Sequence, residues 1–210
     1  NGHILHIHLG LIGKFRKFDL QHQPSETVRL RLEAASVAWQ LTGPQTCSVI
    51  DEDEWAYRIS KLGPDPLRLG KRGGKEFCEN ILSTSIPLGA ALLNQQFIAG
   101  IGNVYRSEIL FLNGIRPDVS GKELTLKQAE EIWDTTVMLL RKGKAWNRIV
   151  TITPEDHGSR VTKKALDENA LYVYKRGGLS CRRCSGFITQ STSAGRSIWY
   201  CPSCQKGSNA

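Results

Sequence analysis

Four cysteines arranged in two pairs constrain this chain more than any other feature of its sequence. They stand as Cys181-x2-Cys184 and Cys201-x2-Cys204, with sixteen residues between the two pairs. Two such knuckles joined by one hairpin can place four thiolates tetrahedrally around a single Zn²⁺. Because the segment has few apolar residues, metal binding would supply much of its folding free energy, on the order of 10 kcal/mol. The spacing therefore predicts a structural metal site, since four thiolates leave no open coordination position for catalysis.

Two disulfides or a redox Cys-x-x-Cys pair are the other interpretations of these cysteines. Cys47 and Cys78 are left as single thiols, and the sequence shows no secretory signal with a basic start and an apolar middle. Both observations speak against disulfides, which belong to oxidising compartments. We therefore expect one structural zinc ion, held by Cys181, Cys184, Cys201 and Cys204.

The charge of the chain favours a polyanionic partner. Its 28 basic and 20 acidic residues give a net charge of +8, although a basic balance alone does not require such a partner. The stretch from residue 175 to 206 holds six basic residues and no acidic one, so phosphate contacts are expected there. No run of 18 apolar residues occurs, and no membrane partner is expected.

Three regions of the sequence differ in their patterning. Residues 1–66 alternate apolar and polar side chains between glycine turns, as in 4–9 and 28–32, which predicts strands. Residues 75–165 have a helical pattern, with short helices expected over 88–97 and 104–112. Thr125 and Gln128 form a capping box that opens a further helix, and Gly143 is expected to end it. A small cysteine-bearing module follows from about residue 170.

A glycine turn precedes the helix expected to begin near residue 104. In Gly100-Ile101-Gly102-Asn103 the glycines permit a sharp turn and the close approach of another molecule. The first free N–H groups of the helix would then face a phosphate, with Asn103 as N-cap or as an additional donor. A plain helix-turn-helix corner explains the same residues equally well. Arg196, expected at the tip of the cysteine module's hairpin, is a second candidate for a phosphate contact, or else a solvated turn arginine.

Five segments, in chain order, resemble the motifs of one enzyme family. They are residues 8–15, 94–111, 114–117, 171–178 and 195–205. The second segment reads NQQFIAGIGNVYRSEILF and is similar to a helix-two-turns-helix signature. The last two are similar to the strand and hairpin of a zinc finger, and the first to a strand-turn that carries a DNA-inserting residue. Together they resemble the formamidopyrimidine-DNA glycosylase / endonuclease VIII family.

The resemblance implies a fold and an activity. The fold would be a multidomain α+β protein with a partial N-terminal antiparallel β-sandwich over residues 1–70. A helix-two-turns-helix domain over 71–168 and a C-terminal β-hairpin zinc finger over 169–210 would follow. Such enzymes flip an oxidised base out of duplex DNA, cleave its glycosidic bond and nick the abasic site, at a flipping cost of a few kcal/mol.

The resemblance also assigns roles to individual residues. Asn103, with the turn glycines Gly100 and Gly102, and Arg196 would grip the phosphates that flank the lesion. Arg196 would also assist elimination of the second phosphate, which makes it the catalytic candidate within this chain. Leu11 stands where the family places a wedge that fills the hole left by the flipped nucleotide, although a core leucine is the simpler interpretation. Arg176 is a further phosphate candidate, or else a solvated cation.

The family pattern is not matched everywhere. The family's nucleophilic N-terminal proline, the adjacent glutamate and a later lysine have no counterpart in this sequence, so we expect the catalytic segment to be missing from this chain. The family's arginine–phenylalanine element is not evident either, since residues 40–44 read QLTGP. Together with the form of the segment 8–15, this favours the endonuclease VIII-like branch, which prefers oxidised pyrimidines.

The resulting hypothesis is a DNA glycosylase and abasic-site lyase of base-excision repair. It would bind damaged double-stranded DNA as a monomer in the bacterial cytoplasm, at the nucleoid. One alternative is a non-catalytic damaged-DNA-binding protein that uses the same helix pair and zinc finger. Another is an RNA-associated zinc-ribbon protein, since bulk charge does not separate the two nucleic acids.

Overall fold

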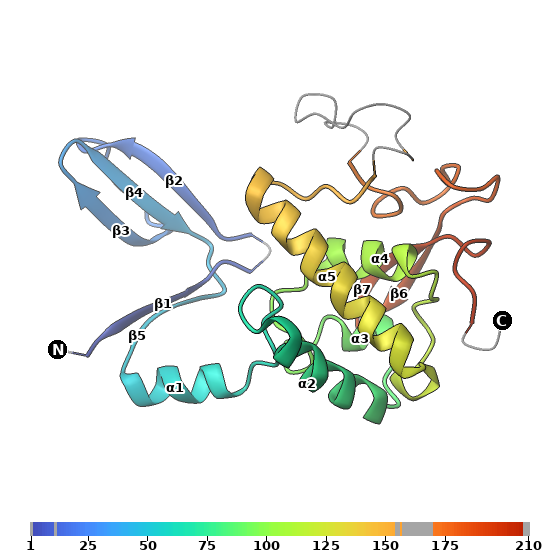
Figure 1. The fold of residues 1–210 in the computed structure, drawn as a ribbon. Coiled ribbons are helices and arrows are strands. Elements are labelled where there is room, and N and C mark those ends of the chain that lie inside the picture. The colour runs from blue at the N-terminus through green and yellow to red at the C-terminus, as the bar shows by residue number, and fades with distance from the viewer. Residues whose placement is uncertain (1, 11, 154–155, 157–169, 208–210) are drawn as a thin grey trace. The chain divides into compact units, whose positions relative to one another are not determined.

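The computed structural model describes residues 2–10, 12–153, 156 and 170–207 (Figure 1). The chain divides into two compact units, Asn1–Ser60 and Lys61–Ala210. Among the residues described, none of the helices has both the length and the apolar composition that a bilayer crossing requires.

The first unit is built from two antiparallel sheets (Figure 1). Strand β1 (Ile4–His8) pairs with β5 (Thr46–Ile50). The second sheet has the order β2–β4–β3, formed by Lys14–Asp19, Val37–Thr42 and Val28–Ala34. The strands predicted from alternating side chains are therefore confirmed.

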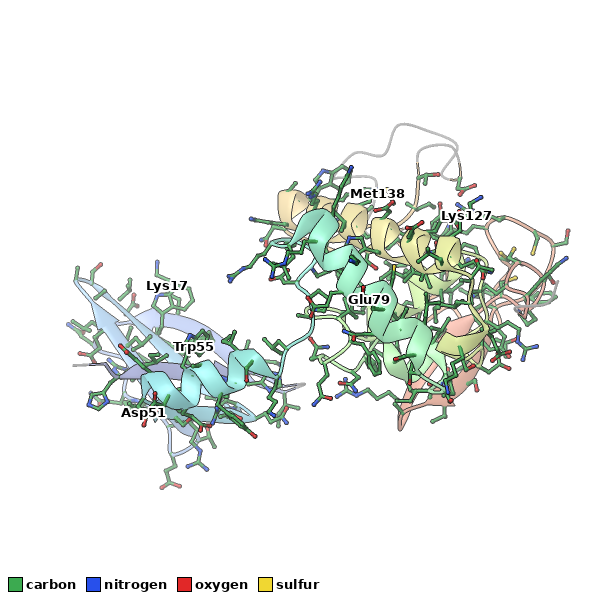
Figure 2. The ribbon with its side chains drawn as sticks, turned by 60° about the horizontal axis from the view of Figure 1, so that its bottom comes forward. Lys17, Asp51, Trp55, Glu79, Lys127 and Met138 are labelled. Atoms are coloured by element: carbon green, nitrogen blue, oxygen red, sulfur yellow. The ribbon has the colours of Figure 1, made fainter. Side chains whose placement is uncertain are left out.

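Within the first unit, side chains are buried on strand β4, and a helix follows the last strand. Ala38 and Leu41 of β4 are fully buried. Helix α1 (Glu52–Ser60) follows β5, and the carboxylate of Asp51 accepts the backbone N–H of Glu54 at 2.8 Å, which caps its first turn (Figure 2). Trp55 on this helix keeps 41% of its surface exposed, so α1 buries only part of its apolar face.

Helices dominate the second unit. They are α2 (Gly70–Ser83), α3 (Leu88–Ala91), α4 (Asn103–Leu112), the 3₁₀ turn η1 (Gly121–Glu123) and α5 (Leu126–Trp146). Helices α2 and α5 pack closely at two glycines of α2. A Cβ at Gly73 would lie 2.8 Å from the Trp133 ring of α5, and a Cβ at Gly74 would lie 2.9 Å from it. Figure 2 labels Glu79 on α2 and Lys127 and Met138 on α5, residues of this helix pair.

Two predicted helix ends are wrong. Helix α3 ends at Ala91 rather than near residue 97. There the Asn94 side chain accepts the backbone N–H of Gln96 at 3.0 Å, an interaction that favours a turn over a helix. Helix α5 continues through Gly143 to Trp146 and ends at Asn147, which adopts the left-handed conformation with φ of 51°.

The start of α5 is as predicted. The Thr125 side chain accepts the backbone N–H of Gln128 at 3.2 Å, and the Gln128 side chain accepts that of Thr125 at 2.8 Å. This reciprocal pair is the capping box, which satisfies two N–H groups that a helix start leaves without partners.

The C-terminal hairpin consists of β6 (Thr189–Ser193), the turn Ala194-Gly195 and β7 (Arg196–Tyr200). Both turn residues have positive φ, 51° and 69°, as a two-residue type I′ hairpin requires. The turn fixes the register in which Ser193 lies opposite Arg196.

Two hydrophobic cores lie in the second unit, and α4 contributes to both. Ile109 and Leu110 belong to the core formed with α2, α3 and α5. Phe111 belongs to a second core that includes Tyr172, Trp199 and the cysteines Cys181 and Cys201. The cysteine module is thus packed on α4 rather than standing apart from it. The mixed α and β fold with antiparallel sheets, the helix pair and a C-terminal hairpin is confirmed, whereas the three domain boundaries stay a prediction.

Candidate metal centre and nucleic-acid interface

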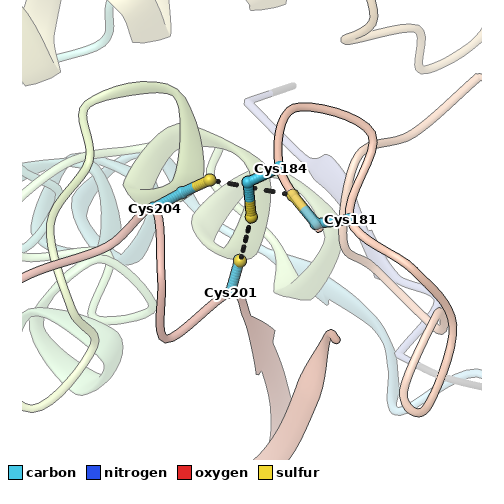
Figure 3. Close-up of side chains that lie close together, drawn as sticks. All are labelled: Cys181, Cys184, Cys201 and Cys204. Carbon is cyan, nitrogen blue, oxygen red and sulfur yellow. Dashed lines mark hydrogen bonds between the residues drawn. The ribbon is translucent and has the colours of Figure 1, made fainter. Parts of the chain in front are cut away.

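The four cysteine sulfurs form one cluster (Figure 3). The Sγ atoms of Cys181 and Cys204 are 3.7 Å apart, those of Cys184 and Cys201 are 3.6 Å apart, and all four lie within 4.8 Å of one another. A disulfide needs about 2.05 Å between sulfurs, so no two of them are bonded. Zn–S bonds of about 2.3 Å place tetrahedral sulfurs roughly 3.8 Å apart. The residues therefore fit one tetrahedral ion, and the predicted cluster is confirmed.

Backbone geometry prepares these sulfurs for a cation. The N–H groups of Arg183 and Gly186 donate to the Sγ atoms of Cys181 and Cys184, both at 3.4 Å. The Gly186 N–H lowers the pKa of the Cys184 thiol to about 7. Burial raises the pKa of the Cys201 thiol, and a bound cation would favour its thiolate form.

The turn between α3 and α4 is held by a side chain that the sequence analysis did not single out. Gln95 donates from Nε2 to the carbonyl of Ile101 at 3.0 Å, and its Oε1 accepts the N–H of Gly100 at 2.9 Å. Gly100 has φ of 89°, which favours glycine. Gln95 could have been identified in the sequence by its position, because an amide side chain that can both donate and accept stands just before a glycine turn.

The start of α4 faces open space. The helix begins at Asn103, and Gly102 rather than Asn103 takes the N-cap position, which corrects the prediction. Gly102 has φ of −113° and ψ of −175°, an extended conformation open to any residue. Within the described part of the chain, nothing lies within 4 Å of a Cβ built at Gly100 or at Gly102. Another molecule can therefore approach the free N–H groups of this helix start.

Asn103 joins the helix start to the C-terminal hairpin. Its Nδ2 donates to the carbonyl of Ser197 in β7 at 3.1 Å. That nitrogen carries a second proton for a further acceptor. Its Oδ1 is buried and has no partner among the described residues. Asn103 is therefore both a brace and an available donor.

Arg196 is the first residue of β7, directly after the hairpin turn, as the sequence predicted. Its side chain is exposed. Among the described residues, its guanidinium has neither a hydrogen bond nor an ion pair, and only its backbone carbonyl accepts a side-chain donor, from Arg106. Asn103 contacts the carbonyl of Ser197, the neighbour of Arg196 in β7, so α4 and the start of β7 lie side by side here, 94 residues apart in the sequence.

A buried arginine holds this arrangement and was missed in the sequence. Arg106 in α4 is fully buried. Its Nη1 donates to the carbonyls of Gly89 and, at 3.2 Å, of Ser193. Its Nη2 donates to the carbonyls of Arg196 at 3.3 Å and Ser197 at 3.2 Å. Burial, followed by the charge of Arg196, lowers the pKa of Arg106 to about 10.

Glu108 anchors the chain as it enters the cysteine module. Its carboxylate accepts N–H groups of three consecutive residues at 2.8 Å and the Thr151 hydroxyl. The three donors are Tyr172, Val173 and Tyr174. These contacts run from α4 to the segment that precedes the cysteines.

Arg176 and Leu11 are the two remaining residues that were predicted to contact DNA. Arg176 donates from Nη2 to the carbonyl of Ser180 at 2.9 Å and from Nη1 to that of Tyr172, and burial lowers its pKa. It braces the loop before the cysteines, and its contact with phosphate stays a prediction. Leu11 lies outside the residues that the structure describes.

Comparisons with known sequences agree on one family. Residues 62–166 match the family described as the formamidopyrimidine-DNA glycosylase H2TH domain. The chain is 36% identical over 210 residues to Endonuclease 8 1 of Mycobacterium tuberculosis, covering 97% of this chain and 77% of that protein. It is 29% identical over 222 residues to the formamidopyrimidine-DNA glycosylase of Carboxydothermus hydrogenoformans, covering 92% of this chain and 78% of that protein.

A solved structure agrees as well. The chain resembles the crystal structure of Lactococcus lactis formamidopyrimidine-DNA glycosylase bound non-covalently to DNA that contains an abasic site. The TM-score is 0.80 and the identity 26%, over 98% of this chain and 75% of that chain.

Proposed function

The chain belongs to the formamidopyrimidine-DNA glycosylase and endonuclease VIII family, and from this premise we propose that it is a DNA glycosylase of base-excision repair. It excises oxidised bases, with a preference for pyrimidines, and cleaves the resulting abasic site. The likeness to Endonuclease 8 1 over almost the whole chain supports this branch of the family. The single structural observation that carries the proposal is the hydrogen bond from Asn103 to the carbonyl of Ser197, the residue next to Arg196.

The proposed DNA grip has two points of contact. The open helix start at Gly102 and the second Nδ2 proton of Asn103 donate to one phosphate. The exposed guanidinium of Arg196 donates to a neighbouring phosphate through its planar fork. Two fixed points on one strand hold the backbone bent while the damaged base leaves the stack, at a cost of a few kcal/mol that is smallest for a poorly stacked base.

Arg196 has a second proposed role in cleaving the strand. Elimination at the abasic site leaves negative charge on a phosphate oxygen as the C–O bond breaks. A guanidinium already placed at that phosphate stabilises the developing charge without further rearrangement. Arg196 is therefore the catalytic residue that we propose within the described chain.

The proposed cofactor is one structural zinc ion at Cys181, Cys184, Cys201 and Cys204. With four thiolate ligands the ion would supply folding energy rather than chemistry. Its effect on DNA is indirect, because the two cysteine pairs flank the hairpin that carries Arg196. The proposed partner is damaged double-stranded DNA bound by a monomer, with Arg176 and Leu11 as additional contacts.

Borohydride trapping tests the enzymatic part of the proposal. The product of the complete gene would be incubated with duplexes that carry one oxidised pyrimidine, one oxidised purine or no lesion. We expect it to form a covalent adduct, more with the pyrimidine than with the purine lesion. It should also bind a duplex with a stable abasic-site analogue more tightly than an undamaged one.

The outcomes separate the candidate functions. Tight binding to the abasic analogue without any trapping would overturn catalysis and favour a damage-binding protein. Equal affinity for damaged and undamaged duplex would overturn recognition of damage. Tighter binding to structured RNA at the same salt concentration would favour the zinc-ribbon RNA alternative.

A further inference from the structure

Arg106 is fully buried, yet its guanidinium donates to backbone carbonyls in α3 and on both sides of the hairpin turn. We propose that Arg106 is a positioning residue that locks the C-terminal hairpin onto α3 and α4, so that Arg196 and Asn103 act as one phosphate-binding unit. This inference rests on the proposed function of the site. It adds a residue that acts through others, because Arg106 is fully buried.

The contacts of Arg106 fall on both sides of the hairpin turn. On one side it donates to Ser193, the last residue of β6, and on the other to Arg196 and Ser197, the first residues of β7. The same guanidinium donates to Gly89 in α3. The guanidinium is planar and its donor directions are fixed. Its hydrogen bonds therefore define the position and orientation of the hairpin turn relative to α3 and α4.

Ser197 connects this lock to the helix start. Its carbonyl accepts from Nη2 of Arg106 at 3.2 Å and from Nδ2 of Asn103 at 3.1 Å. Two α4 side chains three residues apart therefore converge on one backbone oxygen beside Arg196. A displacement of the hairpin would change the positions of both phosphate contacts together.

The charge of Arg106 also favours an anion at this place. None of the described carboxylates pairs with Arg106, and its charge is compensated by carbonyl oxygens alone. After burial, the charge of Arg196 is the next cause that lowers the pKa of Arg106, so the two cations repel each other. A buried cation without an anion is costly, and a phosphate at Arg196 would offset that cost. The lock is therefore expected to be most favourable when DNA is bound.

Gly89 lies where the hairpin packs against α3. A Cβ at this position would lie 2.9 Å from Oγ of Ser193 and 3.1 Å from Cδ1 of Ile198. The missing side chain lets the turn approach α3 closely enough for Arg106 to reach both. Gly89→Ala therefore offers a second way to loosen the lock, one that leaves the guanidinium and its charge in place.

A double-mutant cycle tests the proposal. Affinity for a duplex with one tetrahydrofuran abasic-site analogue would be measured for the parent chain, Arg196→Ala, Arg106→Lys and the double variant. Arg106→Lys keeps the positive charge but loses the fork. We expect Arg196→Ala to weaken binding of the parent chain roughly 10- to 100-fold, as loss of a charged hydrogen bond does. In the Arg106→Lys background the same change should cost less than about threefold.

The second variant and a matched control isolate positioning from stability. Gly89→Ala should reduce the effect of Arg196→Ala in the same way. Arg183→Lys is the control, because Arg183 also attaches the cysteine module, through Asp156 at 2.8 Å and the Tyr172 ring, without contacting the hairpin turn. With Arg183→Lys the Arg196→Ala penalty should remain full size. Metal content and thermal melting would be recorded for every variant.

Each outcome bears on a separate claim. Additive penalties for Arg106→Lys and Arg196→Ala, in a chain that keeps its metal, would overturn the positioning role while leaving the proposed function intact. A parent chain that binds the abasic duplex no better than an undamaged one would overturn both. If Arg106→Lys fails to fold, full additivity of Gly89→Ala with Arg196→Ala overturns the proposal, and strong coupling supports it.

Discussion

At the scale of single residues, Glu108 shows how one buried carboxylate directs the path of the chain. It is itself fully buried and accepts N–H groups from three consecutive residues and the hydroxyl of Thr151. Glu108→Gln would set an amide N–H₂ against backbone N–H groups, leaving buried donors without acceptors. We expect the free energy of unfolding to fall by about 3–5 kcal/mol. Urea unfolding and metal content would measure the change.

An exposed glutamate gives the control for this prediction. Glu131 keeps 52% of its side chain exposed and pairs with Lys127 at 3.9 Å. Glu131→Gln should change stability by less than about 0.5 kcal/mol, since exposed pairs contribute little. Equal effects of the two substitutions would contradict a special role for the buried carboxylate.

Some residues of the candidate site could be predicted from the sequence and others could not, for a physical reason. The cysteine pairs, Asn103 and Arg196 were predicted because local spacing or a turn position marks them. Arg106 was not, because an arginine in a short helix is ordinarily solvated. Its burial depends on carbonyls that lie 87 to 91 residues later in the chain. Local patterns carry no information about such distant acceptors.

At the scale of elements, α5 contains a glycine where a good helix former would ordinarily stabilise the helix. A Cβ at Gly143 would lie 2.1 Å from the Tyr105 hydroxyl oxygen of α4. Ala would add about 1 kcal/mol of helix propensity. It would also force the two helices apart, and overpacking of this kind costs about 1–3 kcal/mol. We therefore expect Gly143→Ala to lower the melting temperature rather than to raise it.

Removal of the clashing atom provides the rescue. In the double variant Tyr105→Phe/Gly143→Ala the nearest ring atom would lie at 3.5 Å, an ordinary contact. The double variant should then melt at or above the temperature of Tyr105→Phe alone. Continued destabilisation would show that the glycine serves some other requirement of the helix.

The same glycine explains why one helix end was predicted wrongly. A glycine in the last turn indicates a C-terminus when only local preference is considered. In the structure the helix continues past Gly143 to Trp146. The residue is glycine because a Cβ there would overlap the Tyr105 hydroxyl of α4. The start of α5 was predicted correctly since its capping box is local. Element starts with side-chain caps were therefore more predictable than ends decided by packing.

At the scale of the whole molecule, the described residues of the second unit form two cores that differ in their share of the clustered cysteines. The core of α2, α3 and α5 contains none of the four clustered cysteines. The second core contains Cys181 and Cys201 beside Trp199 and joins the first through α4. Arg106 ties the hairpin to the helices independently of the cysteines. Loss of metal should therefore disorder the knuckles first and the helices least.

Metal removal tests this division of stability. Treatment with a strong chelator should expose four additional reactive thiols, while Cys78, which is only 3% exposed, stays protected. Far-ultraviolet circular dichroism should retain most of its helical signal. Affinity for the abasic-site duplex should fall at least tenfold, because the flanks of the hairpin that carries Arg196 lose their fixed ends. Readdition of Zn²⁺ should restore both thiol protection and binding.

The two signals separate a modular second unit from a fully cooperative one. If the helical signal disappears together with the metal, α4 transmits the loss from one core to the other, and the unit folds as a single cooperative body. If affinity persists without metal, the contacts of Arg106 and Asn103 alone hold the hairpin. Cys204→Ser should then bind DNA like the parent chain, because the ion would stabilise only the ends of the module and not the position of Arg196.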